Sequence, residues 1–428
     1  MNNFFRFFVD SWTYSVDEIR SSKTLQLVAW VLLLGWFLEF LTWSRFSDFT
    51  LNAVEAGRHL CWPFFQSCGD WYFLSTFPYH NTHGLAYGIL FVLLIVAGYA
   101  LAEKRFSLVH GLFAAFFVWE ILVLGMSMRL AVNYWYFHAL YAALFLFSTN
   151  KVTLLRLGAV LLYFFSGLLK LDGGWLRGEY FTALQEGLYF IPDLLIPLAT
   201  NAVVVLEIVL VWFLFSKDKR IRYTVLALLG IFHAYSTLYV GFIYPAVAFP
   251  IVLILFLAKE ETVSPRFIFK KNYIGAFVII SLFVIHAIPY TIEGDSRFTG
   301  EGNRFGMYMF EANYQCDSHA TFHFLGGEEQ EERSVSEFAN RRCDPYAHWF
   351  FFKERCAADP KIERISWTFD VSVNGSDFLR IVDEDNACAL SYEPLSHNAW
   401  IRIPGKDGVE TIRPASPNRY SNFGFGDR

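Results

Sequence analysis

The sequence predicts a membrane all-α bundle of about nine transmembrane helices, followed by a small extracytoplasmic α+β domain. Hydrophobic residues make up 55% of the 428 residues and charged residues only 18%, which is more apolar surface than a soluble chain of this length needs. Runs near 20 apolar residues recur through the first two-thirds of the chain and indicate membrane-spanning helices. After residue 292 these runs stop, and Gly, Asp, Asn, Arg and Glu become common.

The first 23 residues are predicted to be a cytoplasmic interfacial segment. Charged residues are scattered through it from Arg6 to Lys23, and no small-residue cleavage site follows, so a cleavable signal peptide is not indicated. Phe4, Phe5 and Trp12 beside those charges favour an interfacial amphipathic helix, and a partly ordered tail fits equally well. The net charge of -5 is too small to indicate a nucleic-acid partner.

The transmembrane domain is predicted to cover residues 24–292. Its apolar stretches lie at 24–43, 84–102, 106–125, 128–148, 152–171, 195–215, 222–240, 244–258 and 273–292. Basic residues gather before the first stretch and after the second, fourth, sixth and eighth. This alternation predicts a cytoplasmic N-terminus and places residues 44–83, 172–194 and the tail 293–428 outside.

All six cysteines fall in the segments that the charges place outside: Cys61, Cys68, Cys316, Cys343, Cys356 and Cys388. An even number in an oxidising compartment predicts a disulfide framework, whose pairing the sequence leaves open. Cys61 and Cys68 can pair locally, or one of them can tie the loop to the tail. Metal binding with His59, His80 and His83 is the weaker interpretation, because the spacings match no standard zinc pattern.

Ionisable residues occur near the outer ends of six apolar stretches. Groups at that depth avoid lipid by facing one another or a wet cavity. The sequence therefore predicts a polar chamber that opens outward, and the alternative is that some of these groups simply reach the interface from helix ends. The six are Glu39, Glu120, Arg129, Lys170, His233 and His286. His138 and Glu207 lie nearer mid-membrane, where either can be a structural partner.

The tail contains a predicted β-hairpin. Residues 365–373 alternate polar and apolar side chains, as a half-buried strand does. Asn374-Gly375 then gives a strong hairpin signal, and residues 378–382 form the second strand. Residues 334–356 are predicted to be helical. The resulting disulfide-stapled domain can contact a polypeptide substrate or act as a stabilising lid.

Four blocks of sequence resemble the vitamin K-dependent γ-carboxylase family and its bacterial relatives, the horizontally transferred transmembrane domain (HTTM) proteins. The strongest block runs from Tyr163 to Gly178, and the second lysine of the family's lysine pair falls on Lys170. The others are Phe232-His233 followed by residues 241–244, Asn303 to Met309, and Val371 to Asp383. The chain departs from the family at Leu169, Ser236 and Ser376, and Asn133, Trp135 and His138 stand out of register with a further family segment.

The resemblance implies a carbon–carbon lyase or carboxylase that uses a vitamin K-like reduced naphthoquinone, oxygen and carbon dioxide, with no metal predicted. The quinol is deprotonated and reacts with oxygen, a strong base forms and removes a γ-proton from a peptide glutamate, and carbon dioxide adds to the carbanion. Lys170 matches the initiating base. It must be uncharged to accept a proton, and an apolar wall favours that form, whereas Asp172 close by would oppose it.

His233 is the second catalytic candidate. It can hydrogen-bond a quinol oxygen, or it can be a packed histidine bonded to a neighbouring helix. The remaining candidates for substrate or quinone binding are Tyr163, Asp172, Trp175, Glu120, Arg129 and His286. Trp175 can also simply shape the exit of the helix.

Two other functions remain open. A non-catalytic member of the superfamily would bind a lipid or quinone, or dock a partner protein in a membrane complex. A thiol–quinone oxidoreductase would use Cys61 and Cys68, although Cys-x6-Cys is not a redox motif. Expected partners are membrane lipid and an external peptide or protein, without nucleic acid. A bacterial inner membrane is the expected location, and an endoplasmic-reticulum membrane would satisfy the same charges.

Overall fold

The computed structural model describes residues 2–45, 59–71, 82–130, 133–182, 187–258, 273–306, 312–336, 343–406 and 408–413. The chain divides into two compact units. The helical unit comprises Met1–Phe164 and Leu206–Phe283, and the mixed unit comprises Phe165–Val205 and Val284–Arg428. The mixed unit thus joins residues 165–205 to the C-terminal region, a grouping that the sequence did not indicate.

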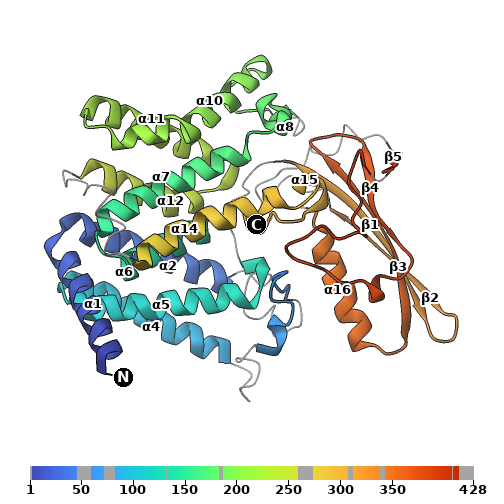
Figure 1. Cartoon of the computed structure of the whole chain (residues 1–428), viewed down its shortest axis with the longest axis horizontal. Helices are drawn as coiled ribbons and strands as arrows, with labels where there is room; N and C mark the ends of the chain where they lie inside the picture. Colours follow the sequence, from blue (N-terminus) through green and yellow to red (C-terminus); the bar gives the residue numbers. More distant parts are fainter. Residues whose placement is uncertain are drawn as a thin grey trace. The chain divides into compact units, whose positions relative to one another are not determined.

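In the part of the chain that the structure describes, the helical unit is built from one amphipathic N-terminal helix and eight apolar helices of different lengths (Figure 1). They are α1 (Asn2–Ser21), α2 (Lys23–Arg45), α4 (Thr82–Ala102), α5 (Phe106–Met126), α6 (Asn133–Phe147), α7 (Lys151–Leu169), α11 (Lys219–Val240), α12 (Ile243–Leu257) and α14 (Tyr273–Ala287). Short 3-10 turns η2 (Cys68–Trp71), η4 (Met128–Leu130) and η6 (Leu210–Phe215) lie between them. The ends of α7 and α14 belong to the mixed unit.

Six helices among the described residues are long and apolar enough to cross a membrane. They span Lys23–Ser44, Leu85–Ala102, Phe106–Met126, Lys151–Leu169, Lys219–Tyr239 and Tyr273–Thr291. The predicted stretches 128–148 and 244–258 form shorter apolar helices, Tyr134–Phe147 and Ile243–Leu257. The stretch 195–215 divides into α10 (Ile196–Ile208) and η6. Six of the nine predicted spans are therefore confirmed as candidate transmembrane helices.

The N-terminal segment is a helix, as one of its two interpretations predicted. Val16 and Ile19 of α1 are buried, and Trp12 meets the ring of His110 edge-on at 4.4 Å between centroids. This packing anchors α1 on α5 within the helical unit.

One buried apolar cluster of the helical unit lies between α2, α5, η4, α6 and α12. It contains Trp43, Val123, Leu124, Met126, Leu130, Trp135 and Val247. The most enclosed of the six candidate spans is α7, because 78% of its apolar stretch is buried, against 22–50% for the other five. A polar residue at the end of α7 is therefore held among protein atoms rather than lipid.

The mixed unit contains a five-stranded antiparallel sheet in the order β2-β1-β3-β4-β5 (Figure 1). The strands are β1 (Tyr314–Phe324), β2 (Glu329–Ser336), β3 (Ile362–Val373), β4 (Phe378–Glu384) and β5 (Thr411–Arg413). Helix α16 (Pro345–Ala358) packs on β3. Short helices complete the unit: α8 (Gly173–Leu176), α9 (Glu179–Thr182), η5 (Asp193–Leu195), α10, η7 (Ile288–Thr291), α15 (Ser296–Thr299) and η8 (Ala387–Ala389).

The predicted hairpin is confirmed. Strands β3 and β4 pair antiparallel around Asn374 and Gly375, which have φ angles of 52° and 74°. Positive φ at both central residues is what a tight two-residue hairpin turn needs, and Asn-Gly adopts it at low cost. The helix predicted over 334–356 begins only at Pro345, since residues 334–336 belong to β2.

Aromatic side chains fill the space between α16 and the sheet. Trp349 and Phe352 are buried on α16, and Phe352 meets Trp367 of β3 edge-on at 5.3 Å. Asp344 caps the helix by accepting a hydrogen bond from the backbone N–H of Tyr346. The capped helix and the apolar face of the sheet therefore form one core.

The disulfide prediction is confirmed, and the structure supplies the pairing. Cys61 bonds Cys68 within the first loop, Cys316 of β1 bonds Cys343, and Cys356 of α16 bonds Cys388 of η8. The local alternative for Cys61 is therefore correct. Sulfurs bonded to each other are not thiolate ligands, so this pairing does not support the metal interpretation. His80 lies outside the described residues, as does the side chain of His83.

Candidate functional site

Lys170 follows the last residue of α7 and is 4% exposed. Its Nζ donates a hydrogen bond of 2.8 Å to the Oγ of Ser166, one helical turn earlier. The same nitrogen lies 5.6 Å from the ring centroid of Trp175. The amine is therefore buried beside a hydroxyl and an aromatic face.

Asp172 pairs with an arginine and with two backbone N–H groups. Its Oδ1 accepts hydrogen bonds from the backbone N–H groups of Gly174 and Trp175, so it caps α8, and it pairs with Arg297 at 2.5 Å. Burial raises the pKa of Asp172, while Arg297 and the two N–H groups act in the opposite direction. These three partners orient the Asp172 carboxylate.

Trp175 is fixed by its indole nitrogen, which donates to the carbonyl oxygen of Thr200 at 3.2 Å. The tip of the β3–β4 hairpin also lies against α8: a Cβ added to Gly174 would stand 2.7 Å from Nδ2 of Asn374. Asn374 in turn accepts from the backbone N–H of Asn313. Residues of the first and fourth resemblance blocks, far apart in sequence, are thus brought into contact.

His286 also belongs to the mixed unit. Its ring stacks on Phe165, with centroids 4.4 Å apart and an interplanar angle of 20°. Phe165 directly precedes Ser166, the partner of Lys170. His286 therefore packs on the turn of α7 that carries the partner of the amine.

His233 belongs to the helical unit and is 2% exposed. Its Nε2 and the hydroxyl of Tyr163 are hydrogen-bonded at 2.5 Å, and the rings of Tyr244 and Phe249 lie within 5.3 Å and 5.1 Å of it between centroids. Tyr163 is on α7 and His233 on α11. This arrangement matches the interpretation of His233 as a packed histidine bonded to a neighbouring helix, and its catalytic role stays a prediction.

Glu120 is buried in the helical unit and has two partners. Its Oε2 accepts from the indole nitrogen of Trp36 at 3.0 Å, and its Oε1 lies 3.1 Å from Nδ1 of His138. Arg129 lies in η4, and its side chain is outside the described part of the chain. Glu120 is thus tied to α2 and α6.

Four residues that hold the site residues in place were not predicted from the sequence. Ser166 contacts Lys170 and Thr200 contacts Trp175. Arg297 pairs with Asp172, and Asn313 donates to Asn374. Ser166 stood inside the strongest block, one turn before Lys170, and this spacing was an available signal. The others come from distant segments, and nothing in their local sequence marks them. No protein-family model, curated protein or solved structure matches this chain.

Proposed function

We propose that this chain is an integral membrane enzyme of the vitamin K-dependent γ-carboxylase type, an HTTM protein in which Lys170 is the initiating base. The reaction would be quinol-driven carboxylation of glutamate in an external peptide. The observation that carries this proposal is the enclosed Lys170 amine, hydrogen-bonded to Ser166 and facing Trp175. The resemblance of the surrounding block supports it.

The base role requires an uncharged amine with an available lone pair. Ser166 accepts one N–H of Lys170 and so fixes the direction of the nitrogen. Trp175 covers the amine with an aromatic face and limits its access to water. The negative charge of Asp172 is compensated by Arg297 and two backbone N–H groups. Asp172 therefore does not depend on a charged Lys170 for a partner, which is compatible with the base role.

The ligand in this proposal is a reduced naphthoquinone, bound beside Lys170. The amine and the Ser166 hydroxyl are groups that could hydrogen-bond the hydroxyl groups of such a ligand, and the aromatic residues near them, Trp175 and Phe165, suit an apolar ring system. The bound quinol would supply the electrons for the reaction with oxygen. The residues named here would bind it, orient it and receive its proton at Nζ of Lys170.

The test is carbon dioxide incorporation into a glutamate-containing peptide by the purified full chain with reduced naphthoquinone and oxygen. Lys170→Ala should abolish incorporation, and Lys170→Arg should do the same because a guanidinium stays protonated. Lys353→Ala is the matched control, since Lys353 also lies over a tryptophan ring, Trp349, but is exposed on α16. Normal incorporation by correctly folded Lys170→Arg would exclude the proposal.

The proposed topology has nine spans, a cytoplasmic N-terminus and an extracytoplasmic C-terminal domain in a bacterial inner membrane. In this topology the six candidate spans, the two shorter apolar helices and the segment α10–η6 would be the nine crossings. Three disulfides in segments assigned to the outside support the orientation. Labelling of cysteines introduced at Lys217 and Glu393 with a membrane-impermeant reagent in intact cells would test it: only the second should react.

A non-catalytic membrane subunit is the second candidate. The hydrogen bond between Tyr163 and His233 favours it, because one of the two catalytic candidates then has a structural partner. Isolation of a stable complex with a partner protein, without quinol turnover, would support this function over the first.

A further inference from the structure

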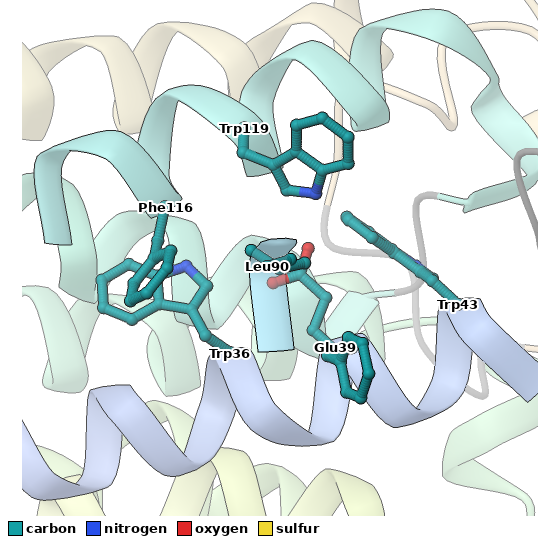
Figure 2. Close-up of a pocket in the computed structure, with 7 residues that line it drawn as sticks. Trp36, Glu39, Trp43, Leu90, Phe116 and Trp119 are labelled. Atoms are coloured by element: carbon teal, nitrogen blue, oxygen red, sulfur yellow. The ribbon is translucent and has the colours of Figure 1, made fainter. Parts of the chain in front are cut away.

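Glu39 of α2 is 3% exposed, and its Oε1 has no hydrogen-bond partner among the described residues. The carboxylate opens onto a small pocket in the helical unit (Figure 2), lined by Trp36, Glu39, Phe40, Trp43, Leu90, Phe116 and Trp119. The cavity is small: the volume open to the centre of a water molecule is about 10 Å³. It has room for one water or one ion but not for an organic ligand.

Two further polar groups converge on Glu39. Glu120 from α5 and His138 from α6 each offer a ligand atom, and the ligand atoms of all three residues lie within 4.8 Å of one another. Glu120 is fully buried and His138 is 1% exposed. Two carboxylates and an imidazole thus lie close together between three apolar helices, where unbalanced charge is unfavourable.

The hydrogen bonds of His138 define its tautomer. Nε2 lies 3.0 Å from the carbonyl oxygen of Leu32, which can only accept, so Nε2 carries a proton. In the neutral ring Nδ1 is then a lone pair, and it faces Oε1 of Glu120 at 3.1 Å. Two acceptors at that distance require a proton or a cation between them. A backbone carbonyl that fixes the far nitrogen is also the usual support of a metal-binding histidine.

Glu120 is oriented in the same way. Its Oε2 accepts the N–H of Trp36, which turns Oε1 toward His138. The indole nitrogens of Trp43 and Trp119, which line the pocket, have no hydrogen-bond partner within the described ranges. Figure 2 shows the Trp119 nitrogen and the Glu39 carboxylate turned toward the same space. These N–H groups could donate to a water at the remaining position of a bound ion.

We propose that Glu39, Glu120 and His138 bind a divalent transition-metal ion. One nitrogen and two carboxylate oxygens suit Zn²⁺, Mn²⁺ or Fe²⁺, and three protein ligands leave a position for water. A divalent ion balances both carboxylates, which removes the charge imbalance, and it replaces the proton between Glu120 and His138. The site is independent of the Lys170 proposal.

The experiment uses the full chain purified in detergent from cells grown with zinc, manganese and iron, with metal content measured by elemental analysis. About one ion per chain is expected, with its loss on chelation and its return on adding Zn²⁺ or Mn²⁺. Glu39→Gln and His138→Gln should each weaken rebinding by more than about tenfold. Glu207→Gln removes another buried membrane carboxylate and should retain the ion.

Two readouts keep the test independent of folding. Circular dichroism should show that each variant retains its helices, and Co²⁺ bound to the wild-type chain should give a visible absorption band that is lost in Glu39→Gln. Absence of metal, together with failure to bind Zn²⁺, Mn²⁺ or Co²⁺, overturns the proposal. An infrared band of a protonated carboxylic acid that persists with Zn²⁺ present and disappears in Glu39→Gln would identify a proton site instead, and would also overturn it.

Discussion

A Cβ atom at Gly35 would stand 2.2 Å from Cδ2 and 2.3 Å from Nε2 of His138. The imidazole therefore lies directly on the backbone of α2, in space that only glycine leaves. This close approach is what lets Nε2 reach the carbonyl oxygen of Leu32, one turn away. The orientation of His138 toward Glu120 depends on a glycine in another helix.

Gly35→Ala should displace His138 and destabilise the protein by about 1–3 kcal/mol, because the ring must leave its carbonyl partner or α2 must shift. Thermal unfolding in detergent measures the effect. Gly98→Ala is the matched control, since its Cβ would meet only Leu33 Cδ2 at 3.6 Å, an ordinary contact. Equal stability of the two variants would contradict the packing described here.

Arg297→Met should leave the carboxylates of Asp172 and Asp295 without their shared cation. The pair is partly buried, with 24% of the Arg297 side chain and 16% of the Asp172 side chain exposed, so we expect a loss of about 1–3 kcal/mol, between the surface and buried limits. Arg177→Met provides the comparison: its side chain is 67% exposed and pairs with Glu179, and its loss should cost less than about 1 kcal/mol. The melting temperatures of both variants decide the outcome.

The sequence predicted what local pattern encodes. Asn374-Gly375 specifies a hairpin through its own backbone preferences, and apolar runs identify helices by composition alone. Strand β2 was missed because Glu329–Ser336 carries polar side chains on both faces and so shows no alternation, as suits a charged edge strand. The run 195–215 looked continuous because no proline or glycine marks the place, near Val209, where the α-helix gives way to a 3-10 turn.

The candidate sites also depend on contacts between distant segments, which local sequence patterns do not predict. Lys170, Asp172 and Trp175 stood in one block, so their importance was visible, but their partners Arg297 and Thr200 come from remote segments. Glu39, Glu120 and His138 lie on three helices, and only the packing of those helices brings their ligand atoms together. Hydropathy shows which helices are apolar, but it does not show which faces of those helices pack against one another.

Tyr163→Phe tests the packed interpretation of His233. Removal of the hydroxyl deprives a buried imidazole nitrogen of its partner, which should cost about 1–3 kcal/mol. Tyr141→Phe is a close control, because Tyr141 is also fully buried in the helical unit but its hydroxyl has no hydrogen-bond partner among the described residues. That change should be neutral or stabilising. Unfolding temperatures that fall equally in the two variants would argue against a structural role for the Tyr163–His233 bond.

The stability of the mixed unit should depend on pH through Glu301. Glu301 is 1% exposed and accepts hydrogen bonds from His397 and from the backbone and side chain of Asn398. Burial raises its pKa above the usual 4.5, although those hydrogen bonds oppose the shift. The folded state therefore binds this proton more tightly than the unfolded state does.

It follows that the contribution of Glu301 to stability is fully present below pH 4.5, the usual pKa of this carboxyl, and declines as the pH rises through its folded pKa. Glu301→Gln cannot titrate, so its unfolding temperature should fall less steeply with pH over that window. Glu393→Gln replaces an exposed acid nearby, leaves His397 in place as the first variant does, and should reproduce the wild-type slope. Parallel wild-type and Glu301→Gln profiles would mean that the buried carboxyl titrates alike in the folded and unfolded chain.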